Sequence, residues 1–210
     1  MNQKLVKAWD DLTPFKSIFY FLFLLFFFHF SWKIAIGGDI EDNFMLFFGK
    51  DVTPAWFYTA QLWLTKAVAW FVHLLPNTDD LITNDTRLYF PEENIRISIV
   101  WGCTGIKQMA IFAGIMIFYR CFTLIKKTGN TTYSVKFLPY WNKLWYIPLG
   151  CVILTLYNII RIGLIVLFTR EHPEQFDFYH DGIFRFIYYG IIFLIWVIWE
   201  EVYVIKRNKK

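Results

Sequence analysis

Three side chains of this sequence could together carry out nucleophilic chemistry on a peptide bond. Cys103 offers a thiol, His180 a group that titrates near neutral pH, and Arg161 a permanent positive charge. A cysteine nucleophile needs a thiolate, a proton donor for the leaving amine and positive charge near the tetrahedral oxyanion. The residue types therefore match those of an enzyme that cleaves a peptide bond with a cysteine nucleophile.

Cys103 stands at the start of an apolar run, with glycines on both sides of the Cys103-Thr104 pair. A thiol at a helix amino terminus lies near unpaired backbone N–H groups and the positive end of the helix dipole, which both favour the thiolate. The simpler interpretation is a small residue that fills the start of a helix. The other two cysteines, Cys121 and Cys151, lie within apolar runs without metal-binding spacing, so we expect no metal and no cofactor.

Arg161 lies within an apolar segment, about 12 Å below the end of the predicted helix at 1.5 Å per residue. A charged side chain inside a membrane span is costly and usually faces a cavity or a partner. The alternative is a packing residue that pairs only with a carboxylate or with carbonyl groups. Asn158, one turn earlier on the same helical face, could form a hydrogen bond in that cavity.

His180 lies in a polar segment just before the last apolar run, where it could transfer protons. A loop histidine beside an acidic residue, here Asp181, is more often a solvated polar group. His172 in the same segment competes for the acid/base role. His180 is therefore a candidate on position and residue type alone.

The composition requires a membrane. Of 210 residues, 57% are hydrophobic and 22% aromatic, and the apolar residues form unbroken runs. The formal charge of +4 is modest and the basic residues gather beside the apolar runs, so we interpret them as topology signals and expect no nucleic-acid partner. The sequence has no internal repeat and no linker, which favours a single domain over residues 1–210.

Four apolar runs are long enough to cross a hydrocarbon core of about 30 Å, and a fifth is ambiguous. The ambiguous run, residues 55–75, carries Thr59, Lys66 and His73 on one helical face, which favours an interfacial or re-entrant helix over a crossing. We therefore expect an all-α integral membrane protein, a bundle of four to five transmembrane helices with that additional helix. The four clear spans are residues 15–36, 104–125, 144–168 and 183–205.

Lysine and arginine residues in short loops indicate the orientation. They follow the second and fourth clear spans, which places those segments in the cytoplasm and Cys103 on the opposite face, together with the loop 169–182. Residues 87–100, two β-prone runs around a polar turn, should form a short extracytoplasmic β-hairpin that could offer an edge to an extended peptide. The basic residues are Lys126, Lys127, Lys136, Lys143, Lys206, Arg207, Lys209 and Lys210.

The candidate residues lie in motifs that resemble those of the exosortase/archaeosortase family of multi-pass membrane cysteine transpeptidases. That family shows a Cys-Ser/Thr/Asn-Gly element, an Asn-x-x-Arg-Val/Ile element and a later histidine. The resemblance covers about half of the chain and marks residues 94–205 as a catalytic half. The matching residues are Cys103-Thr104-Gly105, Asn158-Ile-Ile-Arg161-Ile162 and His180.

The resemblance implies a function, a substrate and a location. Cys103 would attack a peptide bond in the carboxy-terminal sorting signal of an exported protein, made of a short motif, a transmembrane helix and a basic tail. The thioester would pass to an unknown acceptor, with His180 as acid/base and Arg161 steadying the oxyanion or the thiolate. The protein would lie in a bacterial inner membrane with its active site on the extracytoplasmic face. Asn158, Thr104 and Gly105 would support that site.

Two other classes of protein also fit the residues. A non-catalytic scaffold of surface-protein or polysaccharide export could keep the same fold without using the thiol. A small transporter or channel would tolerate Arg161 in a span, but the sequence lacks paired intramembrane carboxylates and broken-helix repeats. Replacement of Cys103 separates an enzyme from a scaffold, because only the enzyme needs the thiol.

Overall fold

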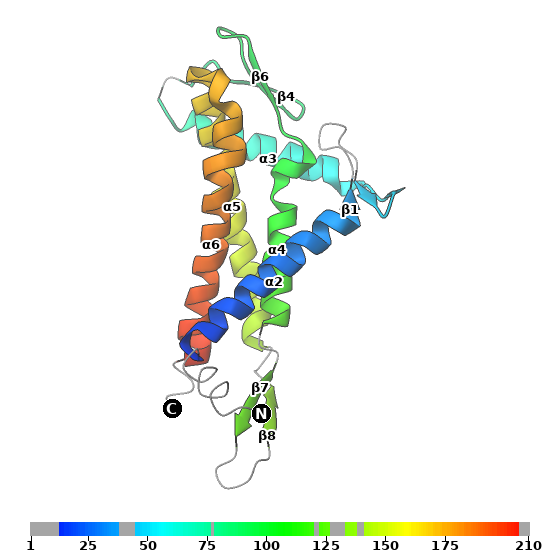
Figure 1. Cartoon of the computed structure of the whole chain (residues 1–210). Helices are drawn as coiled ribbons and strands as arrows, with labels where there is room; N and C mark the ends of the chain where they lie inside the picture. Colours follow the sequence, from blue (N-terminus) through cyan, green and yellow to red (C-terminus); the bar gives the residue numbers. More distant parts are fainter. Residues whose placement is uncertain are drawn as a thin grey trace.

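The computed structural model describes residues 13–37, 45–76, 78–119, 122–126, 133–137 and 141–205. Three long helices form its body: α2 (Thr13–Ala35), α5 (Trp141–Glu171) and α6 (Phe184–Trp199). The shorter helix α4 (Ile106–Phe118) packs against both α2 and α5, and α2 crosses it obliquely (Figure 1). π-Helical turns, η3 (Phe178–Ile183) and η4 (Glu200–Ile205), extend α6 at its two ends.

Three segments of the described chain are long and apolar enough to cross a membrane. They are Ser17–Ala35, Trp141–Glu171 and Phe178–Tyr203. Large apolar side chains such as Phe23 and Leu194 are exposed on these helices. Extensive apolar surface of this kind is expected where a helix meets lipid rather than water.

The prediction of four to five transmembrane helices is wrong for the described residues, because the expected span 104–125 is not one long helix. Its helical part is Ile106–Phe118, about 20 Å long at 1.5 Å per residue. The chain then forms strand β7 (Phe122–Lys126), which pairs antiparallel with β8 (Tyr133–Phe137). An apolar run of β-prone residues has the composition of a strand as well as that of a helix, which explains the error.

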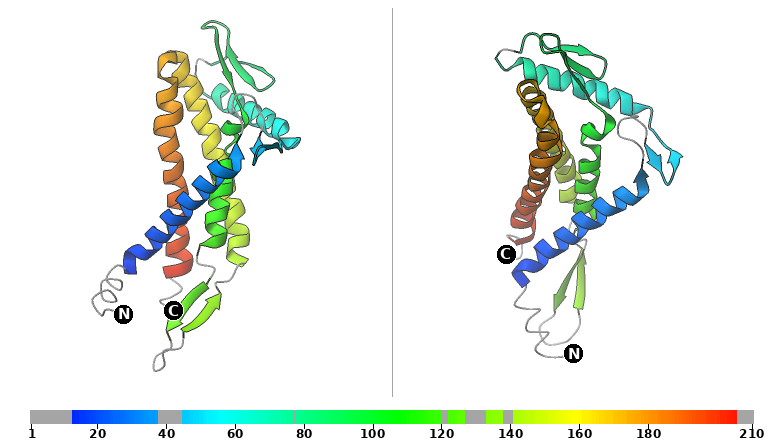
Figure 2. Two further views of the ribbon diagram at one scale, coloured as in Figure 1. Left: turned by 45° about the vertical axis from the view of Figure 1, so that its right-hand side comes forward. Right: turned by 45° about the horizontal axis from the view of Figure 1, so that its top comes forward.

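Helix α3 (Trp56–His73) lies across one end of the bundle (Figures 1 and 2). This crosswise orientation agrees with the interfacial interpretation of residues 55–75. α3 packs on α5 at Gly163, where an added Cβ would come within 2.5 Å of the Phe71 ring. The absence of a side chain at Gly163 therefore allows the two helices to approach closely.

An antiparallel sheet in the order β4-β5-β6 stands beside α3, and its strands are β4 (Ile82–Asn84), β5 (Arg87–Phe90) and β6 (Ile95–Ser98). The predicted hairpin at residues 87–100 is confirmed as β5 and β6. β4 was not expected, since it has three residues and all are exposed. A second small sheet follows α2 and consists of β1 (Ile36–Gly37), β2 (Leu46–Phe47) and β3 (Lys50–Asp51).

Buried apolar residues form two clusters that divide the molecule along its length. One lies among α2, α4, α5 and α6 and includes Phe112 and Trp196. The other lies between α3, the β4-β5-β6 sheet and α5, and includes Val68, Leu88 and Val166. Cys103 is packed against this second cluster, so the candidate nucleophile belongs to the end of the molecule that carries α3 and the sheet.

Polar contacts join the helices at the other end, near β7 and β8. The buried Glu200 carboxylate accepts hydrogen bonds from Ser17 Oγ and Tyr119 Oη, both at 2.8 Å. Lys143 Nζ donates to the carbonyl oxygens of Tyr119 (2.8 Å) and Ile117 (3.2 Å) and so caps the end of α4. Predicted topology signals at Lys127 and at Lys206, Arg207, Lys209 and Lys210, like Cys121, lie outside the described residues.

Candidate active site

Cys103 lies in a short 3₁₀ turn, η1 (Trp101–Thr104), rather than in the first turn of α4. Its backbone N–H donates to Val100 O (2.9 Å), and Thr104 Oγ1 donates to Trp101 O (2.6 Å). Gly105, with φ of 75°, then turns the chain into α4. The helix therefore begins at Ile106, later than expected, and the partly buried Cys103 precedes it by one turn.

Asn158 connects this turn to Arg161 on α5. Its Nδ2 donates to Cys103 O (2.7 Å), and its Oδ1 accepts from Arg161 Nη1 (3.2 Å). The two α5 residues are three positions apart, so they share one face of the helix, as predicted. The structure thus brings Cys103, Asn158 and Arg161 together by hydrogen bonds from segments far apart in the sequence.

Arg161 is a buried cation, with 7% of its surface exposed. Within the described residues it forms no ion pair, and its Nε atom has no hydrogen-bond partner. A buried charge without a counter-charge is unfavourable unless a partner arrives or the site serves one. This arrangement leaves positive charge and an unused donor beside the Cys103 turn, which argues against a purely structural pairing with a carboxylate.

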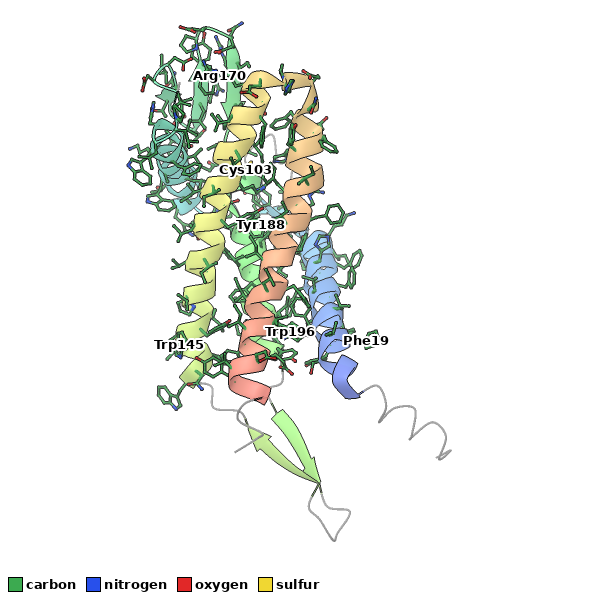
Figure 3. The ribbon with its side chains drawn as sticks, turned by 90° about the vertical axis from the view of Figure 1, so that its left-hand side faces the viewer. Phe19, Cys103, Trp145, Arg170, Tyr188 and Trp196 are labelled. Carbon is green, nitrogen blue, oxygen red and sulfur yellow. The ribbon has the colours of Figure 1, made fainter. Side chains whose placement is uncertain are left out.

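Tyr188 on α6 closes the site and was not predicted. Its side chain is 1% exposed, and its hydroxyl donates to Leu154 O (3.2 Å). A Cβ added at Gly105 would lie 2.9 Å from Tyr188 Oη and 3.2 Å from Asn158 Nδ2. In Figure 3 Cys103 lies above Tyr188 and below Arg170, toward the end that carries the sheet. Two features therefore favour glycine at position 105: the left-handed backbone conformation and the close packing against Tyr188 and Asn158.

His180 is partly buried in η3, at the turn that joins α5 to α6. Its ring stacks on Phe176, with centroids 5.2 Å apart and planes 12° from parallel. The expected loop 169–182 is largely helical, because α5 continues to Glu171 and a 3₁₀ turn, η2 (Pro173–Gln175), leads toward η3. His180 is thus near the same end of the bundle as Cys103, and its acid/base role stays a prediction.

The competing His172 is exposed at the α5–α6 turn. Its Nδ1 lies 3.5 Å from Glu174 Oε1, and both side chains are more than half exposed. An exposed histidine beside an exposed carboxylate is the ordinary solvated arrangement. His172 is therefore a weaker candidate than His180 for proton transfer.

Ion pairs connect the β4-β5-β6 sheet to the end of α5. Arg170 pairs with Asp80 (3.0 Å) and with Glu93 (2.6 Å), and its guanidinium lies 4.6 Å from the centre of the Phe90 ring. Asp80, Glu92 and Glu93 bring carboxylate oxygens within 4.8 Å of one another, the geometry of a possible cation site. Because Arg170 already neutralises two of these carboxylates, we interpret the group as a structural ion-pair network.

An open cleft of about 390 Å³ lies between the start of α3 and the β4–β5 turn. Tyr58 donates a hydrogen bond to Asp85 across it, and this bond raises the pKa of the tyrosine hydroxyl. Phe57, also in the lining, stacks on Trp101 two residues before Cys103, with ring centroids 6.0 Å apart. The cleft is therefore connected to the Cys103 turn through one aromatic contact.

Comparisons with known proteins add no assignment. Neither the family models, nor the curated proteins, nor the solved structures include a match to this chain. The function must therefore be argued from the geometry of the site and from the sequence motifs.

Proposed function

We propose that the chain is a membrane-embedded cysteine protease or transpeptidase with Cys103 as its nucleophile. One observation carries the proposal: Asn158 joins the backbone of Cys103 to Arg161, a buried cation for which the described residues supply no counter-charge. A structural cysteine needs no such charge beside it. A cysteine that forms a tetrahedral oxyanion does, because that negative charge must be stabilised away from water.

The residues divide the chemistry as follows. Cys103 Sγ, as the thiolate, attacks the carbonyl carbon of the scissile peptide bond, and the carbonyl electrons move onto the oxygen. Arg161 and the first N–H groups of α4 stabilise that oxyanion. When the oxyanion collapses, the C–N bond breaks, the amine leaves with a proton from His180, and a thioester remains on Cys103.

The second half of the reaction releases the thioester. His180, now unprotonated, accepts a proton from an incoming amine or water, whose lone pair attacks the thioester carbonyl. The C–S bond breaks and Cys103 returns to the thiolate. The acceptor decides between transfer and hydrolysis.

The resemblance of the motifs to the exosortase/archaeosortase family supports a substrate class. We propose that it is an exported protein with a carboxy-terminal sorting signal, formed by a short motif, a membrane helix and a basic tail. The site lies at one end of apolar helices, where a membrane-anchored peptide would expose the residues just outside its own helix. We propose, from the basic residues beside the apolar runs, that this end faces away from the cytoplasm. The family resemblance supports a bacterial inner membrane as the location.

The test is replacement of Cys103 by alanine in cells that contain a tagged exported protein from the same genome with such a carboxy-terminal signal. We expect Cys103→Ala to abolish removal of the signal while the chain remains at its normal level in the membrane. Cys151→Ala, which changes another thiol within the helical bundle, is the matched control and should leave processing intact. Processing that continues in Cys103→Ala would point instead to a non-catalytic scaffold.

A further inference from the structure

We propose that the open edge of β6 binds the substrate as an added strand, and that this strand runs parallel to β6 toward Cys103. This inference rests on the proposed function and names the surface on which that substrate docks. The occupant is the extended segment that precedes the substrate's membrane helix. Main-chain hydrogen bonds to a sheet edge are a common way to hold an extended peptide.

The register shows which groups β6 leaves open. Ile99 N–H donates to Thr86 O (2.8 Å), and the two residues stand opposite each other in the continued β5–β6 register. Residues of an antiparallel pair alternate between those that bond to the partner strand and those that face away. The N–H and C=O groups of Arg96 and Ser98 therefore point away from β5.

No other strand covers this edge in the described part of the chain. The sheet order β4-β5-β6 makes β6 an outer strand, and Arg96 and Ser98 are both exposed. Unpaired edges of this kind are usually short, charged or covered, because they attract other chains. β6 is short and carries one arginine, yet the main-chain groups of Arg96 and Ser98 face outward, five to seven residues before Cys103 in the chain.

The positive charge of Arg96 on the outer face of β6 indicates which side chain the bound substrate strand should carry. Arg96 lies over the Tyr89 ring, 5.1 Å from its centre, and its side chain remains exposed. Side chains of neighbouring strands on one face lie within about 5 Å of each other, where opposite charges attract. An acidic residue in the added strand beside Arg96 therefore fits this edge.

The direction follows from the path of the chain. β6 descends from the tip of the sheet toward the start of α4, and Ser98 is followed by Ile99, Val100 and η1 with Cys103 (Figure 1). A substrate anchored by a carboxy-terminal membrane helix descends in the same direction, from the exported domain toward the membrane. Parallel pairing along β6 would therefore deliver the bond that precedes the membrane helix to the Cys103 turn.

The opposite edge of the sheet offers a matched control. β4 pairs with β5 in the register Thr83↔Leu88, and the same alternation makes the Thr83 N–H group point away from β5. Ser98→Pro and Thr83→Pro each remove one outward N–H group without touching a bond to β5. β4 does not lead to Cys103, so only Ser98→Pro removes a group that the proposal uses.

The experiment measures processing of the tagged exported protein by the full chain in its membrane. We expect Ser98→Pro to slow processing by about two- to tenfold, the effect of one lost main-chain hydrogen bond, while Ser98→Ala and Thr83→Pro stay close to the unchanged chain. Equal rates for Ser98→Pro and Thr83→Pro would overturn the docking proposal and leave the role of Cys103 intact. Processing that survives Cys103→Ala would overturn the proposed function instead.

Photocrosslinking tests whether the substrate docks on β6 independently of cleavage. A photoreactive amino acid at position 96 or 98, in the Cys103→Ala background, should capture the tagged protein, and one at position 83 should not. The substrate residue that crosslinks to position 98 should lie closer in sequence to the substrate's membrane helix than the residue that crosslinks to position 96. The reverse order would contradict parallel pairing, and equal capture from position 83 would contradict docking on β6.

Discussion

Gly105 combines two requirements that no other residue type satisfies together. Its φ of 75° lies in the left-handed region, where a side chain is strained. Its Cα faces Tyr188 Oη and Asn158 Nδ2 so closely that an added Cβ would come within 2.9 and 3.2 Å of them. Gly49 has a similar φ of 81° with nothing within 4 Å of its added Cβ, so the two glycines separate backbone strain from packing.

We predict that Gly105→Ala is more damaging than Gly49→Ala. Both substitutions should cost about 1 kcal/mol or more for the left-handed conformation, and Gly105→Ala should lose roughly 1–3 kcal/mol in addition because it displaces Asn158 or Tyr188. Thermal unfolding in detergent measures the difference, and processing of the tagged protein should fall only for Gly105→Ala. Equal losses of stability would show that the close packing around Gly105 is not rigid.

Residue identities predicted part of this site. Asn158 and Arg161 share a helical face by spacing alone, and the structure joins them at 3.2 Å. Tyr188 could not be found in the same way, because it lies in an apolar run where nothing marks one aromatic residue as facing Gly105. The left-handed turn at Gly105 was also missed, since the sequence suggested a helix that continues from Thr104.

Among the elements, Glu200 holds the helices together at the end far from Cys103. Its carboxylate accepts from Ser17 on α2 and from Tyr119 at the end of α4. A buried carboxylate requires such donors, because its desolvation is otherwise unfavourable. The position of α2 across α4 and α6 therefore depends in part on one acidic side chain.

We predict that Glu200→Ala destabilises the bundle by about 2 kcal/mol, because the buried Tyr119 hydroxyl and the partly buried Ser17 hydroxyl lose a charged acceptor. The neighbouring Glu201 is exposed, so Glu201→Ala should change stability by no more than about 0.5 kcal/mol. Thermal unfolding of both variants in the same detergent makes the comparison. A small effect of Glu200→Ala would mean that water replaces the carboxylate at this end.

Helix α4 shows the limit of hydropathy at the level of elements. The run 104–125 is largely apolar, interrupted by Lys107, Gln108 and Arg120, and its periodicity does not reveal that the helix ends at Phe118 and that β7 follows. Pairing with β8 decides this boundary, and pairing partners are not encoded in a local window. The hairpin 87–100 was predictable, because its polar turn separates two short β-prone runs.

Across the whole molecule, the two ends differ in the elements and polar contacts that they carry. At one end, near β7 and β8, Glu200 and Lys143 form hydrogen bonds between the helices (Figure 1). The other end carries α3, the β4-β5-β6 sheet and the Cys103 turn (Figures 1 and 3). The long apolar helices separate them. Under the proposed function, a membrane-anchored substrate would approach Cys103 from the end that carries the sheet.

A covalent intermediate tests the central claim most directly. Membranes containing the chain, mixed with the tagged exported protein and quenched with acid, should contain a thioester between Cys103 and the amino-terminal part of the substrate. Mass spectrometry should locate the adduct on Cys103, neutral hydroxylamine should release it, and Cys103→Ala should lack it. Cleavage of the tagged protein with an adduct on another residue, or with an unchanged yield of product from Cys103→Ala, would contradict the assignment of Cys103 as the nucleophile.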